Sequence, residues 1–255
     1  MSIRLRLANR LILSNTQHAL DPQNRERVAI PCGSDEIEAW VVQKGTRPKV
    51  MCLKFPGTGG RAELAGPHPC EVISDTFSAW TINPPGYGTS TGNACVKKMV
   101  ATCENAWQAI QQKADKCPIV VCGNSLGCMY ALYVASRFKV AGLFLRNPAP
   151  VHQLIKAKHS WWNAGFAYRH IASQVPLTMD AVQNAQQCTA PLFLLMSELD
   201  RRVPPNVQEQ VFDQYAGRKF RFTIPGADHD HPVPEPLIEA YLSAVKTWVD
   251  ELNID

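Results

Sequence analysis

Three residues whose side chains can cooperate in nucleophilic catalysis lie far apart in the sequence, each after an apolar segment. Ser125 lies within Gly123–Gly127, a Gly-x-Ser-x-Gly pattern that follows the apolar run 119–121. Asp200 and His229 come later, and each follows an apolar run of its own. A serine hydroxyl becomes a good nucleophile when a histidine removes its proton and a carboxylate orients that histidine. These residues therefore predict acyl transfer through a covalent acyl-enzyme intermediate.

Other residues could fill two of these roles. His231 also follows the last apolar run, but it precedes a proline and is more restricted, so we favour His229 as the base. Glu198 and Asp228 are alternatives to Asp200 as the acid. Asp200 is preferred because it lies in a loop long enough for its side chain to reach back to the histidine.

Acyl transfer also needs backbone N–H groups that stabilise a developing oxyanion. Leu126, directly after the serine, is expected to supply one. The second is expected from Thr58, in the glycine-rich loop 57–60 that follows the apolar run 50–55. Such a loop could instead hold a phosphate group, but it matches neither the Gly-x-Gly-x-x-Gly nor the Gly-Lys-Ser/Thr pattern.

Alternating strands and helices must position these residues. The central apolar runs are continuous, which is typical of parallel strands covered by helices on both faces. In such sheets, loops at the carboxyl ends of the strands meet at one edge, so the three residues are expected to converge there. The expected strands are 27–31, 36–43, 50–55, 76–83, 119–121, 140–145, 191–196 and 220–224, and the expected helices are 96–113, 128–138 and 237–252.

Composition limits the class of protein. The chain has 255 residues, of which 45% are apolar and 19% are charged, and a net charge of +4. These values predict one globular domain over residues 1–255 and argue against disorder or nucleic-acid binding. The nine scattered cysteines predict small core residues in a reducing, cytoplasmic environment, and no metal or organic cofactor is implied.

The N-terminal segment 1–14 combines apolar residues with three arginines, so we expect neither a signal peptide nor a membrane-spanning helix there. We expect a helix packed on the domain. A basic amphipathic helix lying on a membrane surface is the alternative.

The segment 149–190 is longer than an ordinary connection and is expected to form a helical cap over the site. Its aromatic residues include Trp161 and Trp162, which are expected either to line an acyl pocket or to hold the cap on the domain. Tyr87, in a second glycine-rich loop, could also face the substrate, although this loop is more simply a structural turn.

These features together resemble the α/β-hydrolase superfamily from about residue 27 to residue 252. The resemblance rests on the Gly-x-Ser-x-Gly pattern, the Pro-Gly-Tyr-Gly-x-Ser-x-Gly loop 85–92, the Asp200 loop and the turn 226–229. The branch that it most resembles is that of the BEM46-type and prolyl-oligopeptidase-like serine hydrolases. The resemblance implies an α/β-hydrolase fold, with a mostly parallel central sheet flanked by helices and a short helical cap.

By the same resemblance, Ser125, Asp200 and His229 form the catalytic triad, and Thr58 and Leu126 supply the oxyanion hole. The chain differs from many members of this superfamily at one point: they carry His-Gly before the oxyanion loop, where this chain has Pro56-Gly57. Some members place the catalytic acid at the position of Asn147, which is not an acid in this chain, so Asp200 is favoured.

The resulting prediction is a serine hydrolase that cleaves a small-molecule carboxylic ester, with a thioester as the second choice. The preference for an ester comes from the fold alone. Two other functions stay open. One is a binding module that has kept the fold without catalysis, and the other is acyl transfer to an alcohol or amine in place of water.

Overall fold

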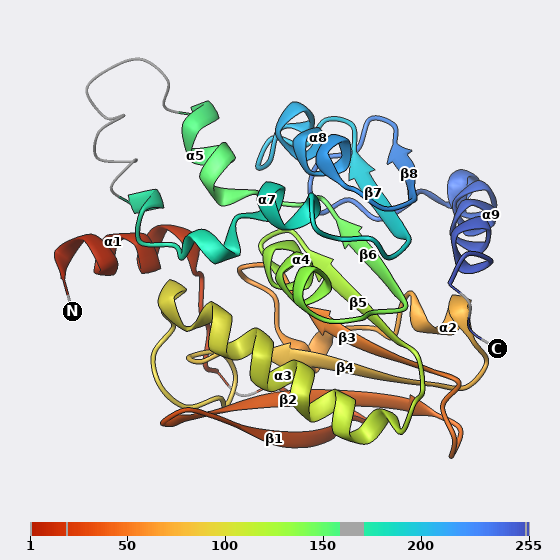
Figure 1. Ribbon diagram of the computed structural model, residues 1–255, viewed down its shortest axis with the longest axis horizontal. Helices are drawn as coiled ribbons and strands as arrows, with labels where there is room; N and C mark the ends of the chain where they lie inside the picture. The colour runs from red at the N-terminus through yellow and green to blue at the C-terminus, as the bar shows by residue number, and fades with distance from the viewer. Residues whose placement is uncertain (1, 19, 159–170, 253, 255) are drawn as a thin grey trace.

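The computed structural model describes residues 2–18, 20–158, 171–252 and 254. Its centre is an eight-stranded sheet with the order β1-β2-β4-β3-β5-β6-β7-β8 (Figure 1). β1 and β2 pair antiparallel, as do β2 and β4, and every later pair is parallel. The strands are β1 (Glu26–Cys32), β2 (Asp35–Lys44), β3 (Val50–Phe55), β4 (Phe77–Asn83), β5 (Ile119–Asn124), β6 (Gly142–Arg146), β7 (Leu192–Ser197) and β8 (Lys219–Ile224).

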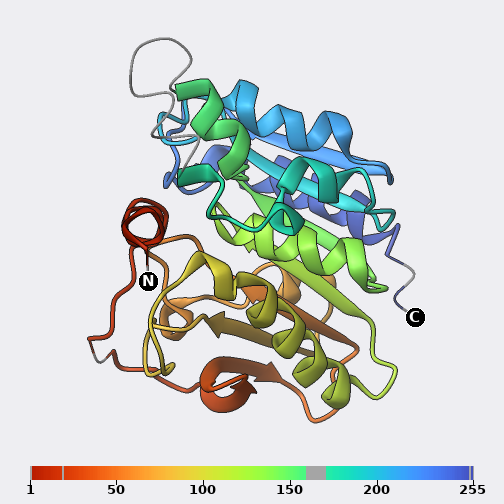
Figure 2. The same cartoon turned by 60° about the vertical axis from the view of Figure 1, so that its left-hand side comes forward.

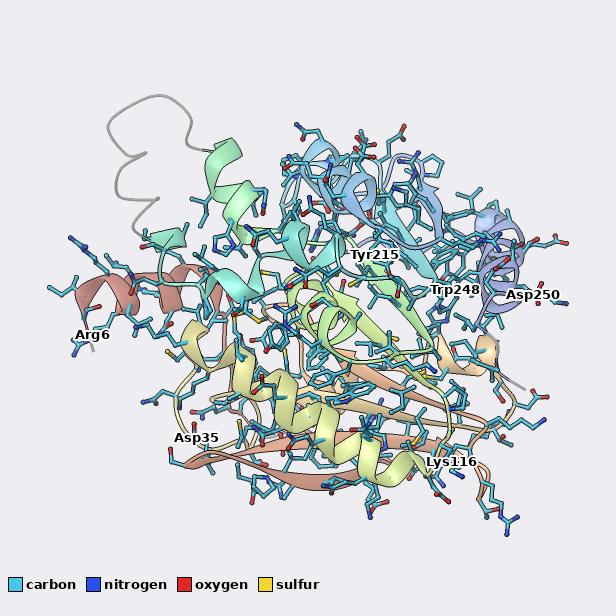
Figure 3. All side chains as sticks on the ribbon, viewed as in Figure 1. Arg6, Asp35, Lys116, Tyr215, Trp248 and Asp250 are labelled. Atoms are coloured by element: carbon cyan, nitrogen blue, oxygen red, sulfur yellow. The ribbon has the colours of Figure 1, made fainter. Side chains whose placement is uncertain are left out.

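Helices cover both faces of this sheet, as the continuous apolar strands predicted. Figure 2 shows α3 (Met99–Ala114) and α4 (Gly127–Arg137) on one face, followed by α7 (Ala181–Ala185) and α8 (Pro205–Gln214). The other face is covered by α2 (Cys70–Ile73) and α9 (Ile238–Val249). Side chains fill both layers, and Figure 3 labels Tyr215 from the first and Trp248 from the second. The predicted α/β-hydrolase fold class is confirmed.

The N-terminal helix α1 (Ile3–Ile12) is packed on the domain, as expected. Leu5 and Ala8 are buried in the same core cluster as residues of α3 and α4. Ile3, Leu7 and Leu11 are exposed on the helix. Among the described residues, none of the helices has the length and apolar character needed to cross a membrane. Contact with a membrane surface stays a prediction.

The long segment between β6 and β7 contains α5 (Val151–Lys158), a 3-10 turn η3 (Leu177–Met179) and α7. Both cartoon views place residues 171–180, directly before α7, next to α1 (Figures 1 and 2). Trp161 and Trp162 lie outside the described residues. The short 3-10 turns η1 (Ala62–Leu64), η2 (Val96–Lys98) and η4 (Glu235–Leu237) complete the structure.

The cysteines behave as small core residues. All nine are free, and seven of them are buried. Burial raises the pKa of the Cys128 and Cys188 thiols, which keeps both in the neutral form. These two sulfur atoms are therefore poor nucleophiles.

Candidate active site

Ser125 lies on a sharp turn between β5 and α4. Its backbone has a φ of 52°, in the left-handed region that a non-glycine residue seldom adopts. The turn requires glycine at positions 123 and 127, because a side chain at either position would collide with neighbouring backbone. A Cβ at Gly127 would collide with the Phe55 carbonyl oxygen, and one at Gly123 would lie 2.6 Å from Cys128 Cα. The sequence pattern therefore reflects close backbone approach, and the turn raises the serine hydroxyl at the edge of the sheet.

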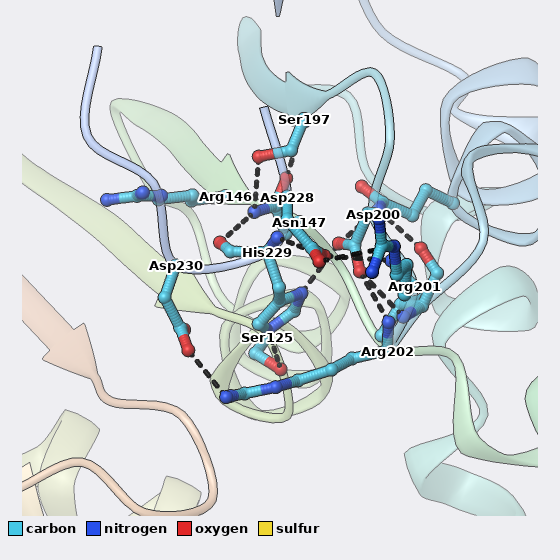
Figure 4. Close-up of polar contacts among 12 residues, drawn as sticks. Ser125, Arg146, Asn147, Ser197, Asp200, Arg201, Arg202, Asp228, His229 and Asp230 are labelled. Carbon is cyan, nitrogen blue, oxygen red and sulfur yellow. Dashed lines mark hydrogen bonds and ion pairs between the residues drawn. The ribbon is translucent and has the colours of Figure 1, made fainter. Parts of the chain in front are cut away.

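The structure brings Ser125, His229 and Asp200 together at this edge (Figure 4). His229 Nε2 lies 3.0 Å from Ser125 Oγ, and His229 Nδ1 lies 2.6 Å from Asp200 Oδ2. His229 and Asp200 are 6% and 3% exposed, so water competes little for their hydrogen bonds. A serine, a base and an orienting carboxylate thus form one continuous chain of contacts.

The Asp200 carboxylate is held in place by further donors. Its Oδ1 accepts hydrogen bonds from the backbone N–H groups of Arg202 (2.9 Å) and Val203 (2.8 Å). Its Oδ2 accepts one from Gln208 Nε2 at 2.8 Å. Gln208 is a fully buried residue of α8, and its role was not predicted. A glutamine at a buried position of an amphipathic helix, eight residues after the acid, was the available signal.

The loop that carries His229 is held by Asn147, at the end of β6. Asn147 Nδ2 donates to the His229 carbonyl oxygen at 2.7 Å and to Ser197 Oγ at 3.0 Å. Its Oδ1 accepts a hydrogen bond from the Ser197 N–H at 2.8 Å. Asn147 is fully buried and has a φ of 45°. Asn147 thus bonds to the backbone of His229, whereas the imidazole Nδ1 of His229 contacts Asp200.

The alternative acids and base have other partners. Glu198 accepts a hydrogen bond from the Gly226 N–H at 2.7 Å. Asp228 accepts backbone bonds from Arg201 and His229, which lower the pKa of its carboxyl. His231 Nδ1 accepts the Asp228 N–H at 3.1 Å. These contacts build the turn around His229, and they support the choice of Asp200 and His229.

The glycine-rich loop 57–60, which is expected to supply an oxyanion donor, packs directly against the serine. A Cβ added at Gly57 would lie 3.3 Å from Ser125 Cβ. The next residue, Thr58, is anchored by the N-terminal segment: its hydroxyl donates to the Ile12 carbonyl at 2.6 Å and accepts the Ser14 N–H at 3.0 Å. Thr58 and Leu126 both line the apolar pocket beside Ser125 that is described below, so their backbone N–H groups are close enough to the serine for the predicted role.

Tyr87 is bonded to the glycine-rich loop 57–60. Its side chain is buried, and its hydroxyl donates to the Thr58 carbonyl at 2.9 Å. In the same loop, a Cβ at Gly88 would collide with the buried Glu38 carboxylate, which accepts the Thr89 N–H at 3.0 Å. This geometry favours the alternative of a structural turn, in which Tyr87 holds the loop 57–60 in place, and substrate contact by Tyr87 stays an untested prediction.

An apolar pocket of about 350 Å³ opens beside the serine. Its walls come from α1, from the oxyanion and serine turns, from the segment that includes α5, and from the loop after β7. Representative lining residues are Leu11, Ile12, Val151, Leu154, Ile155 and Ile171. The predicted lining by Trp161 and Trp162 lies outside the described residues.

Comparison with known proteins agrees with this architecture. The Pyrococcus furiosus esterase PF2001 superposes with a TM-score of 0.68 at 12% identity, covering 94% of this chain and 97% of that one. Est1E from Butyrivibrio proteoclasticus superposes with a TM-score of 0.64 at 16% identity, covering 89% and 98%. These likenesses show that the chain has the α/β-hydrolase fold. Its membership of the superfamily, and of a branch within it, stays a prediction.

Sequence similarity is more limited. Human alpha/beta hydrolase domain-containing protein 17C is 30% identical over 100 residues, which is 38% of this chain. The match spans about a quarter of that relative's length, 26%. An uncharacterized protein of Mycobacterium tuberculosis, Rv2307c, is 26% identical over 149 residues, covering 58% of this chain and 51% of the relative. No family model matches the chain.

Proposed function

We propose that this α/β-hydrolase is a serine esterase that cleaves a small-molecule carboxylic ester through an acyl-enzyme intermediate. The observation that carries the proposal is the chain of contacts from Asp200 through His229 to Ser125, with distances of 2.6 and 3.0 Å. Two structural neighbours are themselves named esterases, which agrees with the reaction class.

In the proposed mechanism, Ser125 Oγ attacks the ester carbonyl while His229 Nε2 takes its proton. Asp200 holds His229 in the tautomer that leaves Nε2 free to accept, and it stabilises the imidazolium that forms. The tetrahedral intermediate collapses when the ester C–O bond breaks and His229 returns the proton to the leaving oxygen. Water, activated by the same histidine, then releases the acid from Ser125.

The Leu126 and Thr58 backbone N–H groups are proposed to stabilise the oxyanion, each contributing about 3 kcal/mol in the transition state. The anchoring of Thr58 by the N-terminal segment and by Tyr87 supports this role, because an oxyanion hole must be rigid before the charge develops.

We further propose that the apolar pocket receives the acyl group and that residues 149–190 act as a cap over it. The support is that Leu154, Ile155 and Ile171 of this segment line the pocket together with Leu11 and Ile12 of the N-terminal helix. Each methylene buried in such a pocket contributes about 0.8 kcal/mol, so kcat/KM should rise about fourfold per added carbon until the pocket is full.

The test is hydrolysis of p-nitrophenyl esters of increasing acyl length by the purified protein and by Ser125→Ala. Saturable hydrolysis that is lost in Ser125→Ala and rises with acyl length supports the proposal. Turnover by Ser125→Ala near the wild-type rate would refute the mechanism, and a rate that is independent of acyl length would refute the acyl pocket.

A further inference from the structure

A second cavity, of about 410 Å³, lies on the other side of the oxyanion loop from the apolar pocket. It is formed where β3, β5 and β6 end, and its lining includes Lys54, Gly57, Asn124, Phe144 and Arg146. The proposed mechanism uses none of its charged residues. We call it the basic cavity.

A third hollow, of about 320 Å³, lies between the basic cavity and the serine and is bordered by residues of both. This hollow shares Gly57 and Asn124 with the basic cavity, and it shares Ser125 and His229 with the apolar pocket. Ser125 therefore stands between an apolar space and a basic one. A substrate whose carbonyl lies at Ser125 can extend into both.

Two cations give the basic cavity its charge. Lys54 Nζ donates to the carbonyl oxygens of Gly66 and of His68, the latter at 2.7 Å. Arg146 donates through one Nη to the His231 carbonyl at 2.7 Å, and its buried Nε has no hydrogen-bond partner among the described residues. All these acceptors are neutral carbonyl oxygens, and neither Lys54 nor Arg146 forms an ion pair with any residue that the structure describes.

The surroundings do not cancel this charge. Arg61, a third lining cation, forms a buried ion pair with Glu63. None of the described lining residues of the basic cavity is an aspartate or glutamate. Asp230 lines the connecting hollow, but it pairs with Arg202 at 2.7 Å, and Figure 4 shows the Arg202 side chain reaching past Ser125 to it.

The effect of the two cations is visible on a neighbouring group. The pKa of His68 is lowered to about 4, first by burial and then by the positive charges of Lys54 and Arg146. The potential here thus disfavours an added positive charge. By the same physics it favours an anion.

We infer that the basic cavity receives a negatively charged leaving group, so that the preferred substrate is an ester of an anionic alcohol. This inference rests on the proposed esterase function. When Ser125 Oγ bonds to the acyl carbon and the ester C–O bond breaks, the leaving oxygen takes the proton from His229 Nε2. The departing alcohol carries its carboxylate, sulfonate or phosphate beside Lys54 and Arg146, while the acyl chain stays in the apolar pocket.

The test compares two butyrate esters of matched size and similar leaving-group acidity. One is 4-carboxyphenyl butyrate, which is an anion at pH 7.5, and the other is neutral 4-carbamoylphenyl butyrate. We expect kcat/KM to favour the anionic ester by about tenfold, since charge-assisted contacts in a partly enclosed site are strong. Lys54→Gln and Arg146→Gln should each reduce this ratio by about fivefold or more. Lys44→Gln removes the same charge from an exposed site on β2 and should leave the ratio unchanged.

A binding measurement separates this inference from the proposed function. Inorganic pyrophosphate is titrated calorimetrically into Ser125→Ala protein, with and without Lys54→Gln or Arg146→Gln, and thermal denaturation checks that each variant is folded. Binding that either substitution weakens supports the basic cavity even if no ester is hydrolysed. Lack of pyrophosphate binding, or an ester ratio near one that neither substitution alters, overturns the inference while leaving esterase activity to its own test.

Discussion

Replacement of Gln208 by leucine tests whether the acid is held in a fixed position by the fold. Gln208 Nε2 donates to Asp200 Oδ2 at 2.8 Å and to the Val203 carbonyl at 2.7 Å. Leucine has a similar volume but cannot donate. The Asp200 carboxylate would keep three of its donors, the N–H groups of Arg202 and Val203 and the His229 ring.

The magnitude follows from these contacts. A hydrogen bond to a buried charged group is worth about 1.5–3 kcal/mol, and an unsatisfied carbonyl costs about 1 kcal/mol more. We therefore expect Gln208→Leu to lower the free energy of unfolding by about 2–4 kcal/mol, which corresponds to a fall of about 5–10 °C in Tm. Since the carboxylate still contacts His229, kcat should fall only about tenfold, far less than the ~10⁴-fold loss expected when such an acid loses its charge.

The assay is thermal denaturation together with ester hydrolysis, and Gln210→Leu is the matched control. Gln210 lies on the same helix but is exposed, so its replacement should change neither quantity appreciably. An unchanged Tm and kcat in Gln208→Leu would refute the proposed support of Asp200. A loss of several thousandfold in kcat without loss of stability would mean that Gln208 takes part in the chemistry.

The remaining predictions concern the neighbouring acids and histidines. Asp200→Asn should lower kcat by about 10³–10⁴-fold, whereas Glu198→Gln should cost less than about tenfold; the reverse order in a kinetic assay would make Glu198 the acid. His231→Gln should retain most activity, and its complete loss would shift the base away from His229. His68 is neutral in the folded protein because its pKa is lowered there from 6.5 to about 4. Its contribution to the free energy of unfolding is therefore fully present above pH 6.5 and is lost as the pH falls toward 4. His68→Gln should therefore flatten the stability profile in that window by about 1–2 kcal/mol, allowing for solvent screening of a partly exposed ring, and an unaltered profile by chemical denaturation would contradict this.

The central elements of this fold could be predicted because their signals are local. β3 begins and ends where the apolar run predicted, and β5 leads into α4 through the predicted turn. The convergence of Ser125, Asp200 and His229 followed from the rule that parallel strands end at one edge. α8 was not predicted, although Pro204 and Pro205 mark its start, and the contact of Gln208 with Asp200 was missed with it.

Other parts depend on contacts between distant segments. The sequence left open whether Tyr87 faces the substrate or belongs to a structural turn, and it could not show that the Tyr87 hydroxyl reaches the Thr58 carbonyl on the adjacent loop. The basic cavity joins Lys54 of β3 to Arg146 of β6, two strands separated by β5 in the sheet. The strands can be predicted from a single sequence, but the contacts between side chains beyond the strand ends cannot.

The most direct test of the central claim is covalent labelling with a fluorophosphonate probe, followed by mass spectrometric mapping of the modified residue. Such probes react with a serine whose proton is removed by a positioned base. The account predicts modification of Ser125 in the wild-type protein and its loss in His229→Ala. Modification of a different residue, or equal labelling of Ser125 in the wild-type and His229→Ala proteins, would contradict it.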